Sequence, residues 1–156
     1  MKIRFLWPRS SADADFTEAI DRYFNRIKHF LPAEIIEIAA DRGRQKSDDL
    51  AMMRGQSERL LKAMPDKGHV AVLDERGQLF DSLKFAKWLE RLTMENPHGI
   101  TFVVGGDVGF DDSVRKRADT LLGLSPMTLP HQLARVVLLE QIYRACTLMR
   151  NIRYHK

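Results

Sequence analysis

The chain has 156 residues, which predicts a single domain over residues 1–156 that can bury a core without a disulfide or a structural metal. With 44% apolar and 29% charged residues it is typical of a soluble globular protein; it has no apolar run of the roughly 18 residues needed to cross a bilayer, and no signal-peptide pattern. The net charge of +4 favours polyanionic partners without deciding for nucleic acid, and the single Cys146 fits a reducing, cytoplasmic location.

Short apolar runs alternate with helical patterns along the chain. Apolar runs predict strands at 2–7, 35–38, 70–73, 100–104 and 121–124. The spacing of apolar residues predicts helices over about 16–30, 82–92 and 131–150, and N-cap residues predict two more over about 48–64, before Pro65, and 111–118. The expected helix caps are Ser47, Ser82 and either Asp111 or Asp112. This alternation predicts an α/β fold with a mainly parallel sheet flanked by helices.

A glycine-rich segment, Gly105-Gly106-Asp107-Val108-Gly109, follows the strand predicted at 100–104. Open parallel sheets bind ligands at the carboxyl ends of their strands, and glycine lets a ligand approach the backbone closely. The segment is therefore either a cofactor-facing turn or a plain strand-to-helix turn that needs positive φ. Val104 stands where a dinucleotide fingerprint has its first glycine, so a nicotinamide-dependent oxidoreductase is the weaker interpretation.

The segment from Leu124 to Gln132 contains Pro126 and Pro130, which forbid a regular helix and stiffen the backbone. The segment is otherwise mostly apolar. A rigid apolar loop at a sheet edge can hold an adenine ring while its backbone N–H and C=O groups read the edge of that ring. A buried connection packed only for stability is an equally good interpretation of these residues alone.

The helix predicted from His131 is apolar in nearly every direction between Leu133 and Met149. Such a helix is buried, and in a domain of this size we expect one of its faces to meet a second copy, which predicts a homodimer. Arg135 lies near the helix start, where the dipole disfavours a cation. It indicates either an anionic partner or a surface or interface salt bridge. Glu140 and Arg144 are four apart and are expected to pair.

The segment 151–156 contains two cationic side chains, and it also contains Tyr154 and His155. Such a set can stack on a base and contact phosphate, or it can be a frayed terminus. The five histidines and Cys146 show no metal-ligand spacing, so no metal site is expected. The sequence also lacks a phosphate-binding loop and a nucleophile elbow.

Four segments together resemble the ribosomal RNA large subunit methyltransferase H family of small SPOUT-type enzymes. They are Val103–Gly106, Leu124–Gln132, Arg135–Ala145 and Tyr154–Lys156. The resemblance covers the whole chain in length and element order and is most specific from Gly105 onward. It implies a SPOUT-type α/β knot, with a trefoil knot in the C-terminal half, and a homodimer with its cofactor site beside the subunit interface.

The activity implied by this resemblance is methylation of N3 of a pseudouridine in helix 69 of 23S rRNA, on the assembled 70S ribosome, with S-adenosylmethionine as methyl donor. The implied cofactor-binding residues are Leu73, Gly105, Gly106, Leu124, Ser125, Pro126, Met127, Thr128 and Leu129. Arg135, Tyr154 and His155 match positions expected near the substrate. The imide nitrogen must lose its proton near the moment of attack, so His131 and His155 are candidate bases by residue type. A non-catalytic ribosome-binding protein is the alternative from another class.

This chain departs from the family pattern in three places. Trp7-Pro8 follows the first strand, where relatives often have Val-Gly. The Asp107-Val108 pair between the glycines is not the usual one. Ile152-Arg153 in the tail replaces a variable pair.

Overall fold

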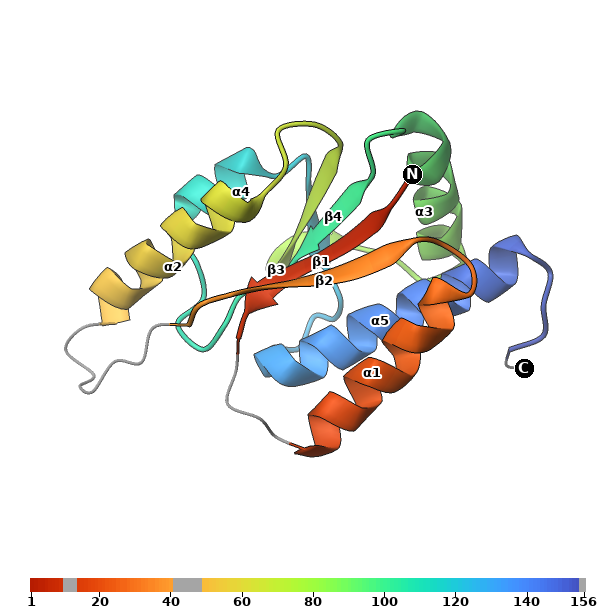
Figure 1. Cartoon of the computed structure of the whole chain (residues 1–156), viewed down its shortest axis with the longest axis horizontal. Helices are drawn as coiled ribbons and strands as arrows, with labels where there is room; N and C mark the ends of the chain where they lie inside the picture. Colours follow the sequence, from red (N-terminus) through yellow and green to blue (C-terminus); the bar gives the residue numbers. More distant parts are fainter. Residues whose placement is uncertain (10–13, 41–48, 155–156) are drawn as a thin grey trace.

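A five-stranded parallel sheet forms the centre of the molecule (Figure 1). The computed structural model describes residues 1–9, 14–40 and 49–154. The strands are β1 (Ile3–Pro8), β2 (Ala33–Ile38), β3 (His69–Leu79), β4 (Ile100–Val103) and β5 (Thr120–Gly123), in the order β2-β1-β4-β3-β5. The helices are α1 (Ala14–Lys28), α2 (Asp49–Ala63), α3 (Ser82–Glu95), α4 (Asp112–Arg117) and α5 (His131–Met149). The predicted α/β class with a parallel sheet is confirmed.

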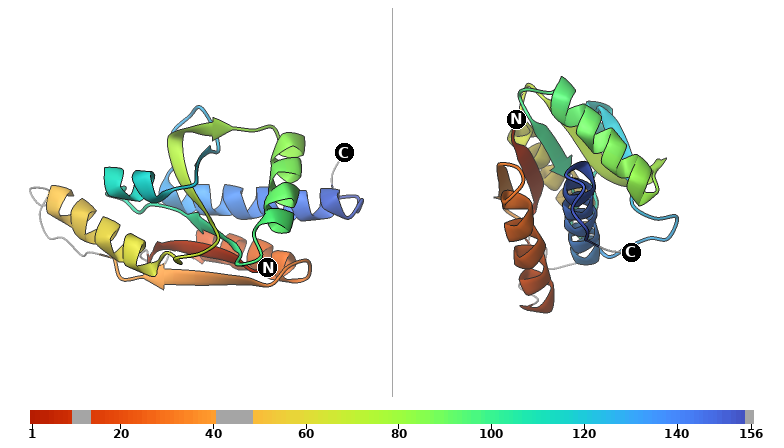
Figure 2. Two further views of the ribbon diagram at one scale, coloured as in Figure 1. Left: turned by 90° about the horizontal axis from the view of Figure 1, so that it is seen from above. Right: turned by 90° about the vertical axis from the view of Figure 1, so that its right-hand side faces the viewer.

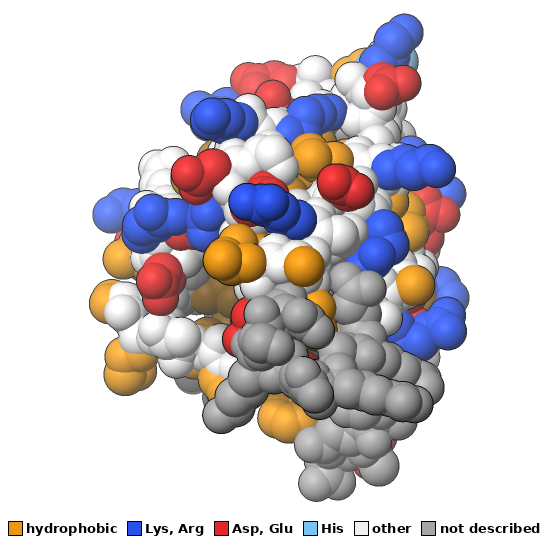
Figure 3. Space-filling model, turned by 90° about the vertical axis from the view of Figure 1, so that its left-hand side faces the viewer, with side chains coloured by type: hydrophobic (Ala, Val, Ile, Leu, Met, Phe, Trp, Pro, Cys, Tyr) orange, Lys and Arg blue, Asp and Glu red, His pale blue; other side chains and the backbone are white. Residues whose placement is uncertain are grey.

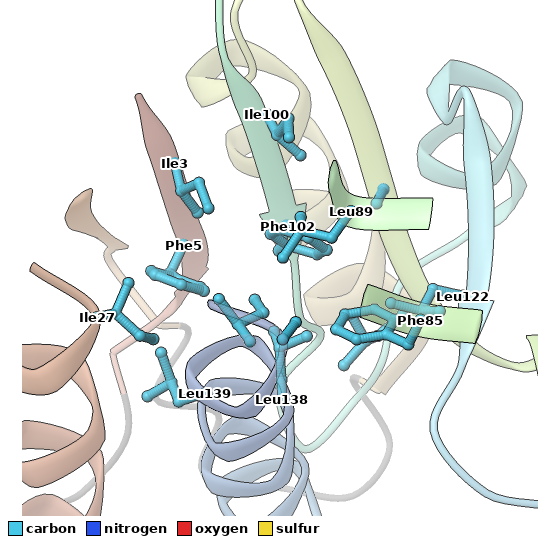
Figure 4. Close-up of a cluster of buried hydrophobic side chains, with 14 of the residues drawn as sticks. Ile3, Phe5, Ile27, Phe85, Leu89, Ile100, Phe102, Leu122, Leu138 and Leu139 are labelled. Atoms are coloured by element: carbon cyan, nitrogen blue, oxygen red, sulfur yellow. The ribbon is translucent and has the colours of Figure 1, made fainter. Parts of the chain in front are cut away.

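Helices cover both faces of this sheet (Figures 1 and 2). Side chains alternate along a strand, so Phe5 and Trp7 of β1 face α1, α3 and α5, whereas Leu6 faces α2 and α4. Figure 4 shows the larger cluster, where Leu138 and Leu139 of α5 meet strand and helix side chains. Every residue of β4 is buried, as a strand covered on both faces requires.

The helix caps agree with the sequence in part. Asp111 caps α4 as predicted, because its carboxylate accepts a hydrogen bond from the backbone N–H of Ser113. The prediction that Ser82 caps α3 is wrong: Asp81 accepts from the N–H of Lys84 at 2.7 Å. The Ser82 hydroxyl instead donates to Gln141 of α5 at 2.7 Å. Ser47 lies outside the described residues.

Strand β3 extends well beyond the predicted end at Leu73. Leu73 and Gln78 both pair with Leu122 of β5, so the four residues between them leave the ladder as a bulge. Gly77 lies in this bulge, and a Cβ added there would be 2.5 Å from the carbonyl carbon of Leu122. Only glycine allows β3 and β5 to approach so closely. The trefoil knot stays a prediction.

Within the described part of the chain, no helix is both long and apolar enough to span a membrane.

Candidate functional site

A cavity of about 750 Å³ opens at the carboxyl edge of the sheet. Because the strands are parallel, the segments that follow β3, β4 and β5 all reach this edge. The residues proposed from the sequence that line this large cavity are Leu73, Gly105, Gly106, Leu124, Ser125, Met127, Thr128 and Leu129. Pro126 is absent from the lining. The structure thus brings together eight of the nine residues in one place.

The loop 124–129 forms one wall of the large cavity and is tied to β3. The Thr128 hydroxyl donates to Glu75 at 3.0 Å, and the Ser125 hydroxyl oxygen accepts from the backbone N–H of Met127 at 2.9 Å. Met127 is 74% exposed, and Pro126 and Thr128 are exposed as well. The alternative of a buried connection is therefore wrong, since the middle of the loop faces solvent.

The glycine segment after β4 forms another wall and needs its glycines for different reasons. Gly109 has a φ of +67°, which a side chain rarely adopts. Gly106 has no positive φ, but an added Cβ would be 2.9 Å from the side-chain oxygen of Gln56. Gln56 is buried and donates to the carbonyl oxygen of Gly109, so it holds the turn from the side of α2. The turn thus needs positive φ at Gly109, as expected for a strand-to-helix turn, and the same segment lines the large cavity, so its cofactor-facing role stays a prediction.

A charged network that the sequence analysis did not single out lies in the bulge of β3. The Asp74 carboxylate accepts hydrogen bonds from Arg76 at 3.2 Å and from Arg115 of α4 at 2.6 Å. Burial alone would raise the pKa of Asp74, but these donors outweigh it and lower that pKa to about 2. Asp74, Arg76 and Arg115 all line the large cavity. The available signal was position, since Asp74 directly follows an apolar strand.

Arg135 is buried with only 2% of its surface exposed, so it is not the surface ion pair that the sequence left open. Its Nη2 donates to the carbonyl oxygen of Pro8 at 2.8 Å, and its guanidinium lies 5.1 Å from the ring centroid of Trp7. Burial lowers its pKa to about 10, against the opposing effect of Glu37 and Asp107. Arg135 also lines a second hollow of about 60 Å³, here called the arginine hollow.

His131 stands between the two spaces. It lines both the large cavity and the arginine hollow, as do Gly106, Asp107 and Val108. Its Nδ1 lies 2.9 Å from the Asp107 carboxylate. Burial lowers the pKa of His131; the Asp107 charge opposes this and the Arg135 charge adds to it. The imidazole is therefore mainly neutral at pH 7.

Tyr154 lies away from the large cavity of its own chain. Its ring makes an edge contact with Tyr143 at 4.6 Å, and the Arg144 guanidinium lies 4.9 Å from the centroid of the Tyr154 ring. Tyr143 is about 18 Å along α5 from His131 at a rise of about 1.5 Å per residue. Within one chain, Arg135 and His131 therefore lie close together, and Tyr154 lies far from both. His155 lies outside the described residues.

Three further observations concern charged and polar side chains. On the side shown in Figure 3, Lys and Arg side chains alternate with Asp and Glu and form no single basic face. Among the residues that the structure describes, no three His, Cys, Asp or Glu side chains are grouped to hold a metal. The expected pair of Glu140 and Arg144 is confirmed.

A family model and several solved structures described as methyltransferases match this chain. A family model described as "Predicted SPOUT methyltransferase" matches residues 1–155. A probable methylase family protein from Haemophilus influenzae superposes with a TM-score of 0.57 at 14% identity, over 99% of this chain and 70% of that one. A putative methyltransferase from Legionella pneumophila, solved with bound SAM, gives 0.53 at 13% identity over 93% and 66%. The family model therefore places the chain among the SPOUT methyltransferases, and the superpositions show that it shares their fold.

Full-length relatives narrow this class. A protein named ribosomal RNA large subunit methyltransferase H from Trichlorobacter lovleyi is 39% identical over 155 residues, which is 99% of both chains. One of the same name from Gemmatimonas aurantiaca is 38% identical over 156 residues, all of both chains. The chain belongs to the ribosomal RNA large subunit methyltransferase H family, which confirms the resemblance drawn from its sequence.

Proposed function

We propose that this protein transfers a methyl group from S-adenosylmethionine to ribosomal RNA. The observation that carries the proposal is the large cavity, walled by the loop 124–129 and separated by His131 from the hollow that holds Arg135. One space suits the cofactor and the other suits the edge of a target base. Nicotinamide chemistry has no matching feature, because the glycine segment lacks the fingerprint.

The large cavity fits this cofactor in size and chemistry. Its volume of about 750 Å³ lies in the range of small-molecule sites, and apolar side chains such as Leu124 and Leu129 can enclose an adenine ring. The lining holds the carboxylates of Asp74, Glu75 and Asp107 against the guanidinium groups of Arg76 and Arg115, and this small excess of negative charge suits a ligand carrying a sulfonium and an ammonium group. When bound, the cofactor supplies a methyl group whose displacement by a nitrogen breaks the carbon–sulfur bond and leaves a neutral thioether.

The proposed substrate is N3 of a pseudouridine in helix 69 of 23S rRNA, within the assembled 70S ribosome in the cytoplasm. The names of the full-length relatives support ribosomal RNA as the substrate. The particular base follows from the family resemblance. A buried arginine beside the site is suited to an anion or a base carbonyl, because its guanidinium presents several donors in a fixed plane. We assign this role to Arg135.

We propose a homodimer in which Tyr154 and His155 of one copy serve the site of the other. Tyr154 cannot reach the large cavity of its own chain along the course that the structure shows, so a second copy is the way to bring the tail there. Helix α5 supports pairing, because Leu133, Val136 and Val137 are only half-buried within one chain. Apolar side chains on a helix surface of this kind suit a subunit interface.

Thermal unfolding with added ligand tests the cofactor. A ligand at one hundred times its Kd adds about 2.7 kcal/mol to the free energy of unfolding, so S-adenosylmethionine or S-adenosylhomocysteine is expected to raise Tm by several degrees. Leu124→Gln in the cavity wall should abolish the shift, while Leu83→Gln on the exposed face of α3 should keep it. A shift with NAD and none with either sulfur compound would overturn the cofactor assignment.

Methyl transfer to ribosomes tests the substrate. Purified 70S ribosomes that lack this methyl group should accept about one labelled methyl per particle, and nuclease digestion should place it on a pseudouridine. Free 23S rRNA serves as the comparison. Labelling of free rRNA at another position, with no label on the ribosomes, would refute the proposed substrate.

Sedimentation tests the homodimer. A mass of one 18.0 kDa chain at micromolar concentration would refute it.

A further inference from the structure

Asp107 and His131 form a pair at the boundary between the two spaces of the site. His131 opens α5, and Asp107 lies in the turn after β4, so the contact joins two elements that close the carboxyl edge of the sheet. Both residues line the large cavity and the arginine hollow. A methyl group that passes from a donor in one space to a base in the other must cross this boundary. On the proposed function, the pair therefore lies beside the place where the reacting nitrogen meets the methyl group.

The contact bears on which nitrogen of the imidazole carries the proton. The Nδ1 of His131 lies 2.9 Å from the Asp107 carboxylate, which offers only acceptors, so we infer that neutral His131 carries its proton on Nδ1. Nε2 is then unprotonated and is the nitrogen able to accept a proton. Carboxylates hold histidines in this tautomer in other enzymes that use an imidazole as base.

We propose that His131 is the general base for the imide nitrogen and that Asp107 is its positioning residue. This inference rests on the proposed function. The N3–H bond of the target base breaks, its electron pair stays on N3, and the proton passes to Nε2 of His131. The imidazolium that forms keeps its Nδ1–H on Asp107, which balances the new charge, and it later returns the proton to water. Of the two histidines considered from the sequence, the proposal takes His131 as the base.

The surroundings of His131 suit this role. Burial and the neighbouring Arg135 charge keep the imidazole neutral before reaction, and Asp107 favours the charged form that appears during it. Other charged groups line the two spaces and belong to further segments of the chain. They are Arg9 after β1, Asp74, Glu75 and Arg76 of β3, and Arg115 of α4. Asp107 is the only carboxylate among the described residues that lines both spaces.

Nitrogen NMR of the cofactor-free protein tests the positioning directly. In the wild type we expect the Nδ1–H tautomer of His131 at pH 7.5. In Asp107→Asn we expect a different tautomer mixture and a lower pKa for His131, because the negative charge is gone. Asp66→Asn, an exposed carboxylate in the loop before β3, is the matched control and should leave both unchanged. A wild-type Nε2–H tautomer would overturn the proposal.

The pH dependence of methyl transfer tests the chemistry. The acid limb of the wild-type profile should follow the NMR-determined pKa of His131, and His131→Gln should lose that limb along with about 10²–10⁴ of kcat. Asp107→Asn should lower kcat by at least tenfold and leave KM for the ribosome within threefold. If the wild type is active and His131→Gln has the same kcat and pH profile, the roles of His131 and Asp107 are wrong, and the proposed methyltransferase activity is kept. If the wild type modifies no ribosomal RNA, both the proposed function and the roles of His131 and Asp107 are refuted.

Discussion

Replacement of Asp74 by asparagine should cost stability that depends on pH. The carboxyl group has an ordinary pKa of 3.8, and in the folded protein its hydrogen bonds to Arg76 and Arg115 outweigh burial and lower it to about 2. That difference corresponds to about 2 kcal/mol of free energy of unfolding at pH 7, at about 1.4 kcal/mol per pH unit. The side chain is 3% exposed, so solvent screens this contribution little.

The sign of the pH dependence follows from the direction of the shift. A carboxyl group whose pKa is lower in the folded state stabilises the fold above its unfolded pKa, and this contribution is lost as the pH falls through the folded value. The Asp74 contribution should therefore be complete at pH 5 to 7 and fall to about 1 kcal/mol at pH 3. The asparagine side chain of the variant cannot ionise, so the difference between the two proteins should shrink over the same interval.

Urea unfolding at pH 7, 5 and 3 measures this difference. Asp74→Asn should unfold with a deficit of about 2 kcal/mol at pH 7 that narrows at pH 3, whereas Asp66→Asn should stay within about 0.5 kcal/mol of wild type throughout. A deficit of the same size at every pH would show that shape and not charge matters at this position. No deficit at pH 7 would refute the stabilising role of the network.

Three further predictions concern the walls of the site and the core. Gly77→Ala forces a Cβ against the backbone of Leu122 and should lower the free energy of unfolding by about 3 kcal/mol, measured by urea titration. Thr128→Val removes the bond to Glu75 and should weaken cofactor binding about threefold by calorimetry, as expected for an exposed hydrogen bond of about 0.7 kcal/mol. Burial raises the pKa of Cys146 to about 11 from 9.0, so the native thiol should react with iodoacetamide at pH 8 at least about a hundredfold more slowly than in urea. Unchanged cofactor affinity in Thr128→Val, or equal thiol rates, would contradict the second and third predictions.

Much of the fold could be predicted from local patterns. Strand β4 could be predicted because a strand buried on both faces is apolar at nearly every position, and such a run is visible in the sequence. The Asp111 cap is also local, since its partner is two residues away. The N-cap of α3 was predicted at Ser82 and not at Asp81 because serine and aspartate are both good caps. The Ser82 hydroxyl donates instead to Gln141, which is distant in sequence and has no local signal.

The parts of the site that were missed depend on contacts distant in sequence. Asp74 pairs with Arg115 across 41 residues, and no local pattern marks that pairing. The bulge of β3 was missed because Asp74 ends the apolar run, although pairing with β5 resumes at Gln78. Burial of Arg135 contradicts the usual preference of arginine for the surface, and its contacts with the ring of Trp7 and the carbonyl of Pro8 come from the other end of the chain.

The bond from Arg135 to Pro8 has a consequence for how the protein is made. It joins residues 127 positions apart, and α5 shares one hydrophobic cluster with Phe5 and Trp7 of β1. The ribosome synthesises β1 long before this helix, so Phe5 and Trp7 gain their contacts with α5 only after α5 has emerged, whereas α1 is available to cover them earlier. Contacts of such long range also slow folding. The nascent chain therefore has no partly assembled site, and competence to bind ligand should appear in a single late step.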